Sequence, residues 1–115
     1  MTDDERAREL WELGTKRLSE GQVEDAVKLF EQSIAVKPTA EGHTFRGWAL
    51  SNLGRLDEAI DDCKKAIELD PDFGNPYNDI GVYLMQKRQF EEAIPWLSEP
   101  SSRSAMNPGI LPTPI

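Results

Sequence analysis

The sequence has few of the features that mark secreted, membrane-bound or disulfide-linked proteins. Its 115 residues contain a single cysteine, Cys63, so no disulfide can form within the chain. No apolar run approaches the length that spans a membrane, and the charged first residues lack the apolar core of a signal peptide. We therefore expect a cytoplasmic protein that does not associate with membranes.

Positive charge is also scarce. Lys and Arg number 13 against 21 Asp and Glu, which gives a net charge of -8, and the isoelectric point is about 4.6. Because neutralising phosphates supplies much of the affinity of nucleic-acid binders, this balance argues against nucleic acid and favours a neutral or basic partner. The alternative is that the acidity only keeps the domain soluble. The acidic pairs Asp61–Asp62 and Glu91–Glu92 are interpreted as solvated helix faces.

Motifs for catalysis and cofactor binding are missing as well. The sequence has no phosphate-binding glycine loop, zinc-ligand spacing or lipidation motif. Cys63 and His43 could form a nucleophile–base pair, but Cys63 occupies an apolar helical position, which favours a buried structural thiol. Residues 70–75 resemble part of a calcium loop without its closing acid, and are better interpreted as a turn. We expect no enzyme, metal or cofactor.

What the chain does contain is an internal repeat. Gly14, Gly47 and Gly81 are separated by 33 and 34 residues. The same spacings recur for Ala26, Ala59 and Ala93, for Gly21 and Gly54 with Arg88 in the third place, and for Pro38 and Pro71. Several independent markers share one period, which is typical of a helical-repeat protein.

Each unit is predicted to be a pair of helices. Apolar residues recur at helical spacing, as Val23, Ala26, Val27, Phe30 and Ile34 in the first unit and as Leu56, Ala59, Ile60, Cys63 and Ile67 in the second. First helices are expected near 4–19, 40–53 and 74–87, and second helices near 22–36, 55–69 and 89–98. Glycines within the first helices should allow close approach of the alanines at 26, 59 and 93.

The pattern resembles the tetratricopeptide repeat family, whose signature is large-x-x-Leu-Gly-x-x-large, then Ala-x-x-x-Phe, then Pro. The matching residues are Leu10, Leu13, Gly14, Ala26, Phe30 and Pro38; His43, Gly47, Leu50, Ala59, Cys63 and Pro71; and Tyr77, Ile80, Gly81, Leu84, Ala93 and Leu97. Departures are His43 for tryptophan, Arg46 for leucine and Arg17 for an aromatic residue, and each should weaken a single contact.

The resemblance implies an all-α fold of three tandem helical hairpins in a right-handed superhelical array. The domain would span 1–98, with repeats at about 7–39, 40–73 and 74–98, the last incomplete. Residues 99–115, rich in proline and serine, are expected to form an extended or disordered tail.

The resemblance also implies a protein-interaction scaffold that binds a peptide or helical segment in its concave groove. Family geometry turns these residues toward the groove: Arg8, Trp11, Glu12 and Thr15; Glu41, Thr44, Phe45, Trp48 and Asn52; and Asn75, Asn78, Asp79, Val82 and Gln86. Trp11, Phe45 and Trp48 lie outside the packing slots of the repeat and are expected to anchor a partner. The alternative is that they pack against neighbouring helices or the tail.

Some members of this family hold the acidic tails of heat-shock chaperones with lysine, asparagine and arginine. The corresponding places here are Trp11, Thr15, Phe45, Asn75 and Asp79, and Asp79 would repel a carboxylate. We therefore expect no useful binding of a chaperone tail, and expect instead a neutral to basic segment with apolar anchors.

The last helix suggests a second function, self-assembly. It carries Phe90 and Trp96, is interrupted by Pro95, and is followed by no further helix. An apolar patch left there could form a homodimer. Alternatively, Ile110, Leu111 and Ile115 of the tail could cover it, or the helix could fray beside a disordered tail.

Overall fold

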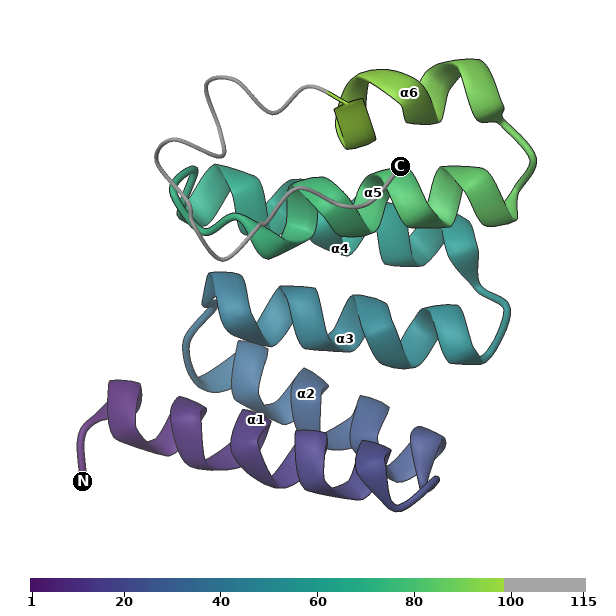
Figure 1. Ribbon diagram of the computed structural model, residues 1–115. Helices are drawn as coiled ribbons and strands as arrows, with labels where there is room; N and C mark the ends of the chain where they lie inside the picture. The colour runs from purple at the N-terminus through teal and green to yellow at the C-terminus, as the bar shows by residue number, and fades with distance from the viewer. Residues whose placement is uncertain (99–115) are drawn as a thin grey trace.

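The structure is a computed structural model that describes residues 1–98. The described chain folds into helices joined by short turns, as predicted (Figure 1). The helices are α1 (Asp3–Ser19), α2 (Val23–Val36), α3 (Ala40–Asn52), α4 (Leu56–Leu69), α5 (Asn75–Gln86) and α6 (Phe90–Ser98). Every predicted helix end falls within one residue of the observed end, so the fold of three helical hairpins is confirmed. The predicted tail, 99–115, lies outside the described residues.

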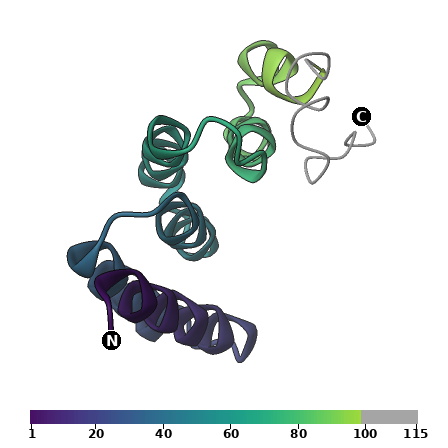
Figure 2. The ribbon, with the colours of Figure 1, turned by 90° about the vertical axis from the view of Figure 1, so that its left-hand side faces the viewer.

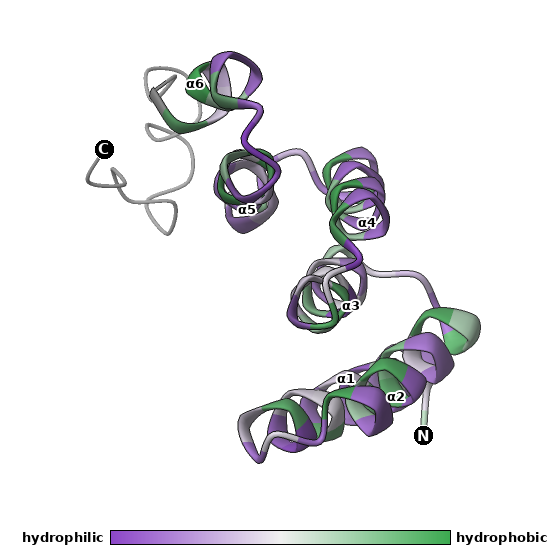
Figure 3. Cartoon of the chain, turned by 90° about the vertical axis from the view of Figure 1, so that its right-hand side faces the viewer, coloured by the Kyte–Doolittle hydropathy of each residue, from purple (hydrophilic) through white to green (hydrophobic). Residues whose placement is uncertain are grey.

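The hairpins stack in sequence order. Each hairpin pairs its own two helices, and α2 and α4 also contact the first helix of the following hairpin. Contacts join α1 to α3 and α3 to α5, whereas within residues 1–98 none joins α2 to α4. The stack is therefore curved, with α1, α3 and α5 on its concave side (Figures 2 and 3). None of the helices described is long and apolar enough to cross a membrane.

Local sequence signals explain where the helices begin and end. Thr2 caps α1 in a reciprocal capping box with Glu5, and the Thr39 hydroxyl accepts a hydrogen bond from the Gly42 amide at 2.9 Å at the start of α3. The turns within the first two hairpins place Gly21 and Gly54 at φ of 83° and 79°. This left-handed conformation suits glycine because it has no Cβ atom.

The core lies between the two layers, and the predicted apolar faces are buried in it. Ala26, Phe30, Ala59 and Cys63 have no exposed surface. Helix α4 turns its apolar side toward α3 and α5 and its polar side outward (Figure 3). Burying these faces supplies the main stabilisation of the stack, because each hairpin buries its second face only against its neighbour.

The regular period of glycines reflects close helix packing, and the nearest neighbour of the glycine differs among the three hairpins. A Cβ atom on Gly47 would lie 3.1 Å from the carbonyl oxygen of Ala59, as expected. On Gly14, however, it would lie 2.5 Å from the Phe30 ring, and on Gly81 it would lie 2.5 Å from Leu97. In those two hairpins the first helix therefore meets the larger side chain one turn beyond the alanine.

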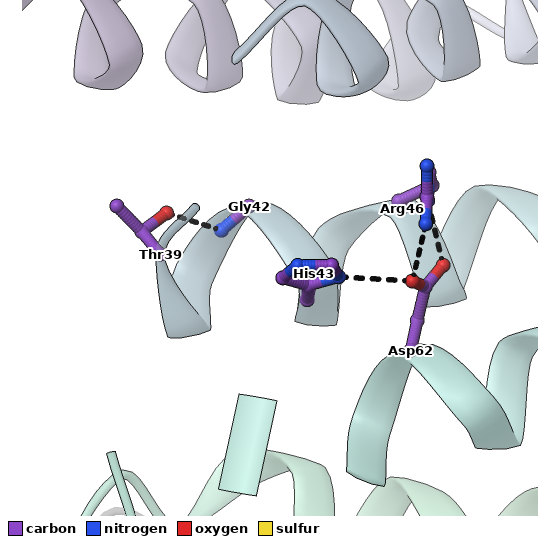
Figure 4. A network of polar contacts seen from close by, with 5 residues as sticks. All are labelled: Thr39, Gly42, His43, Arg46 and Asp62. Atoms are coloured by element: carbon purple, nitrogen blue, oxygen red, sulfur yellow. Dashed lines mark hydrogen bonds and ion pairs between the residues drawn. The ribbon is translucent and has the colours of Figure 1, made fainter. Parts of the chain in front are cut away.

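A buried polar cluster joins α3 to α4 (Figure 4). Arg46 donates two hydrogen bonds to the Asp62 carboxylate, at 2.8 Å from Nε and 2.7 Å from Nη2, and His43 Nδ1 lies 3.0 Å from Asp62 Oδ1. Asp62 is only 3% exposed, so the prediction that it lies on a solvated face is wrong, whereas Asp61 is exposed as predicted. The two departures from the family pattern thus share one buried partner.

Candidate partner-binding face

The inner face is defined here as the accessible surface of α1, α3 and α5. Most residues predicted to contact a partner keep accessible surface on these helices. Exposed members are Arg8, Glu12, Trp48, Asn52 and Gln86, and half-buried members are Trp11, Thr15, Glu41, Phe45, Asn75, Asn78, Asp79 and Val82. These residues can therefore meet a ligand without any change in the fold.

Thr44 does not belong to the inner face, which corrects its prediction as a partner contact. Its side chain is fully buried, and its hydroxyl has no hydrogen-bond partner. It lies 33 residues after the half-buried Trp11, at the same place in the repeat. The difference follows from position and size, because α3 is flanked by both α1 and α5, and a short side chain there is covered by its neighbours.

Three aromatic side chains form a row across α1 and α3. The ring centroids of Trp11 and Phe45 are 5.2 Å apart, and those of Phe45 and Trp48 are also 5.2 Å apart. Phe45 reaches inward to Phe30 of α2, with a centroid distance of 6.2 Å. Trp11 and Phe45 thus pack partly against the core, as the alternative interpretation holds, while Trp48 remains 37% exposed. Within the row, Trp48 offers the most accessible ring to a ligand.

Trp48 is linked to α5 by a hydrogen bond. Its indole Nε1 donates to Oδ2 of Asp79 at 2.8 Å. Burial raises the pKa of the Asp79 carboxyl from its ordinary value of 3.8 to about 6, although the indole hydrogen bond acts in the opposite direction. Within the described residues, no basic side chain forms an ion pair with Asp79. A partly buried negative charge therefore stands beside the exposed indole.

The ends of the inner face are polar. Arg8 and Glu12 form an exposed ion pair at 3.0 Å along α1, and the Thr15 hydroxyl donates to the Glu12 carbonyl at 2.7 Å. On α5, the side-chain oxygen of Asn78 is buried without a hydrogen-bond partner. The face thus has an aromatic centre with polar side chains around it, an arrangement common at protein-binding surfaces.

A second cleft lies away from the aromatic row, among α2, α3 and α4, and encloses about 240 Å³. Four of its seven charged side chains are paired with one another, Arg46 with Asp62 and Arg55 with Glu58. Across residues 1–98, no group of three or more His, Cys, Asp or Glu side chains is placed to hold a metal ion. The inner face remains the stronger candidate because Trp48 is 37% exposed there and Asp79 has no ion-pair partner among residues 1–98.

Two features of the structure were not predicted from the sequence, namely the hydrogen bond between Trp48 and Asp79 and the burial of Asp62. The Trp48–Asp79 hydrogen bond joins residues 31 positions apart, and the only signal for it is that both positions face the groove in the family geometry. The buried state of Asp62 had a clearer signal, since it follows Ala59 by three residues and precedes Ala66 by four, and both alanines are buried.

The stacked hairpins, their period and their curved layers define a helical-repeat protein. The family model of the tetratricopeptide repeat matches residues 40–73. The structure is similar to that of the TPR2B domain of yeast Sti1 in a complex with a pHsp70 peptide, at 30% identity and a TM-score of 0.82, covering 87% of this chain and 81% of that one. The chain belongs to the tetratricopeptide repeat family.

Curated relatives are similar over most of this chain. Small glutamine-rich tetratricopeptide repeat-containing protein 2 of Mycosarcoma maydis is 31% identical over 90 residues, which is 77% of this chain and 26% of the relative. The Hsp70-Hsp90 organising protein of Plasmodium falciparum is 35% identical over 94 residues, which is 81% of this chain and 37% of the relative. The chain therefore spans well under half the length of these relatives.

Proposed function

We propose that this chain is a protein-interaction scaffold that binds a peptide or helical segment of a partner on its inner face. The observation that carries the proposal is the aromatic row of Trp11, Phe45 and Trp48 across α1 and α3, with Trp48 37% exposed. Large aromatic side chains at the centre of a face are the usual energetic anchors of protein binding. The similarity to the Sti1 domain, whose structure contains an Hsp70 peptide, supports a peptide as the ligand class.

The charge of the inner face favours a neutral to basic segment with apolar anchors. Asp79 lies beside the anchor residue, and the whole chain carries a net charge of -8. A positively charged segment gains attraction during approach and in the complex, whereas an acidic segment is repelled. These features support a partner that is protein rather than nucleic acid.

The test is the variant Trp48→Ala, measured against a peptide selected on the wild-type chain from a random peptide library. Calorimetry should show a binding loss of about 2 kcal/mol, because Trp48 is an exposed anchor rather than a core residue. Phe90→Ala serves as the matched control, since Phe90 is an aromatic side chain, 47% exposed, on α6 outside the inner face. The control should bind like the wild type.

Circular dichroism separates binding from folding. The helicity of Trp48→Ala should match that of the wild type, and its free energy of unfolding should fall by about 1–2 kcal/mol, because the variant loses the hydrogen bond to Asp79 but keeps the core. A variant that loses helicity and binding in proportion would show that Trp48 is a structural residue, and the proposal would then lose its main support.

Self-assembly through α6 stays a prediction beside this function. The described residues show an exposed Phe90 on that helix, which is the kind of surface that the prediction requires. Sedimentation of the full chain and of a chain ending at Ser98 tests the prediction, which requires a mass that rises with concentration in both. A mass that stays monomeric in both would eliminate the homodimer.

A further inference from the structure

Two acidic side chains lie next to α3, the buried Asp62 and the half-buried Asp79, and they differ in how their negative charge is compensated. Asp62 receives two hydrogen bonds from Arg46 and a contact from His43, so its charge is compensated internally. Asp79 receives one hydrogen bond, from the neutral indole of Trp48. A partly buried carboxylate without a cation costs free energy, and an incoming positive charge would remove that cost.

The surroundings of Asp79 contain no internal source of positive charge. The charge of Asp79 contributes to the raised pKa of the Cys63 thiol on α4 and of the Tyr83 hydroxyl on α5, so these two titratable groups lie near it. Burial raises the pKa of both the Cys63 thiol and the Tyr83 hydroxyl, so both are neutral, and neither group can carry a positive charge in any protonation state. Within residues 1–98, then, no positive side chain is paired with Asp79.

The arrangement of the Trp48 ring and the Asp79 carboxylate is suited to binding a cation. The indole N–H engages Oδ2 of Asp79, which fixes the carboxylate at the edge of the ring. Oδ1 accepts no hydrogen bond from the described side chains. One part of the ring contacts Phe45, while more than a third of the residue remains accessible. An aromatic face and a carboxylate oxygen are thus offered side by side.

We propose that Trp48 and Asp79 form a subsite for one arginine side chain of the bound segment, whose guanidinium lies against the indole and donates to the Asp79 carboxylate. The inference rests on the proposed function of the inner face. Arginine fits better than lysine, because its planar group can stack on an aromatic ring and present several donors in one plane. The subsite therefore prefers a positively charged side chain, whereas a site for chaperone tails prefers acidic groups.

Three synthetic peptides test the subsite: acetyl-Leu-Ser-Arg-Ser-Leu-amide and its counterparts with citrulline or glutamate in place of arginine. Citrulline keeps the shape of arginine but carries no charge. Binding is followed by the indole N–H signal of Trp48 in nitrogen–proton correlation spectra. The arginine peptide should bind about tenfold more tightly than the citrulline peptide, and the glutamate peptide more weakly than both.

Two matched variants identify the group responsible. Asp79→Asn keeps an acceptor for the indole N–H but removes the charge, and it should reduce the preference for arginine to about threefold or less, which is the share left to the indole. Asp61→Asn removes the same charge from an exposed position on α4, and it should leave the preference unchanged. Carbon NMR of the Asp79 carboxyl adds a direct readout, because the arginine peptide should lower its pKa from about 6 and the citrulline peptide should not.

The outcomes separate the subsite from the function on which it depends. Equal binding of the arginine and citrulline peptides, with no change in Asp79→Asn, would overturn the subsite and leave a groove that binds apolar segments. An arginine preference that persists in Asp79→Asn but disappears in Asp61→Asn would assign it to general electrostatics and would also overturn the subsite. If none of the three peptides moves the indole signal of Trp48 while a library-selected peptide does, the subsite is rejected and the inner-face function stands. If the selected peptide moves neither indole signal, of Trp11 or of Trp48, both are rejected.

Discussion

In the proposed subsite, Asp79 favours binding at the expense of stability. Its carboxyl has a pKa of about 6 in the folded chain against 3.8 ordinarily, so the folded state holds the proton more tightly than the unfolded state. The stability contributed by this group consequently falls as pH rises from about 4 to about 6, and the penalty is fully present at pH 7. Such unfavourable charges are common where a protein is selected to receive a ligand.

Asp79→Asn should therefore stabilise the folded chain at neutral pH. We expect a gain of about 2 kcal/mol at pH 7, because Asn has no charge to desolvate and its side-chain oxygen can still accept from Trp48. Below about pH 4 the gain should vanish, since Asp79 is then protonated in both states. Urea unfolding of both chains at the two pH values measures this, and a gain of equal size at both would contradict the assigned charge effect.

The backbone of Arg88 is strained, which lowers the free energy of unfolding for a different reason. Its φ of 66° places a non-glycine residue in the left-handed region, where the two earlier turns have glycine. Arg88→Gly should stabilise the chain by about 0.5–1 kcal/mol, because removing the Cβ contact outweighs the entropy lost by glycine. Arg88→Ala keeps the Cβ atom and should give no gain. Thermal unfolding compares the three chains, and equal stability of the glycine and alanine variants would refute the strain.

At the scale of helices, the polar cluster of His43, Arg46 and Asp62 fixes how α3 packs on α4. Asp62→Ala should destabilise the chain by about 3 kcal/mol, because it leaves Arg46 partly buried without its carboxylate. The double variant Arg46→Leu/Asp62→Ala should recover most of that loss, since leucine is the usual residue of the family at this place. Urea unfolding measures the coupling, and losses that simply add would show that the pair is not an energetic unit.

The helices could be predicted closely because their ends are marked by local signals, such as Thr39 before α3 and Gly54 after it. Those signals act within a few residues, so the chain reveals them directly. The contacts of Asp62 and Asp79 cross between helices, and they depend on which side chain reaches which neighbour. The candidate site could accordingly be predicted as a face, from aromatic residues outside the packing slots, but not as a set of contacts.

At the scale of the whole molecule, the net charge of -8 and the acidic Asp79 set an expectation for the chaperone peptides that some similar structures contain. One such structure, the second TPR domain of Spaghetti, contains the HSP90 peptide SRMEEVD, and its 23% identity to this chain shows a shared fold only. We expect no micromolar, salt-sensitive binding of that peptide here, because Asp79 repels acidic groups and the places corresponding to the chaperone clamp hold no lysine or arginine. Titration at low and high salt measures it, and tight binding that weakens with salt would refute the expectation.

Because Cys63 is buried, the reactivity of its thiol measures how cooperatively the hairpins unfold. The thiol is fully buried in the middle hairpin, 3.7 Å from where a Cβ on Gly47 would lie, and it is the sole cysteine of the chain. A thiol reagent can therefore react only when that hairpin opens, and in a stack of coupled repeats the opening includes at least one neighbouring interface. The labelling rate, measured across urea concentrations, should approach the rate expected for global unfolding. Faster labelling would show that the end hairpins can separate while the remainder stays folded.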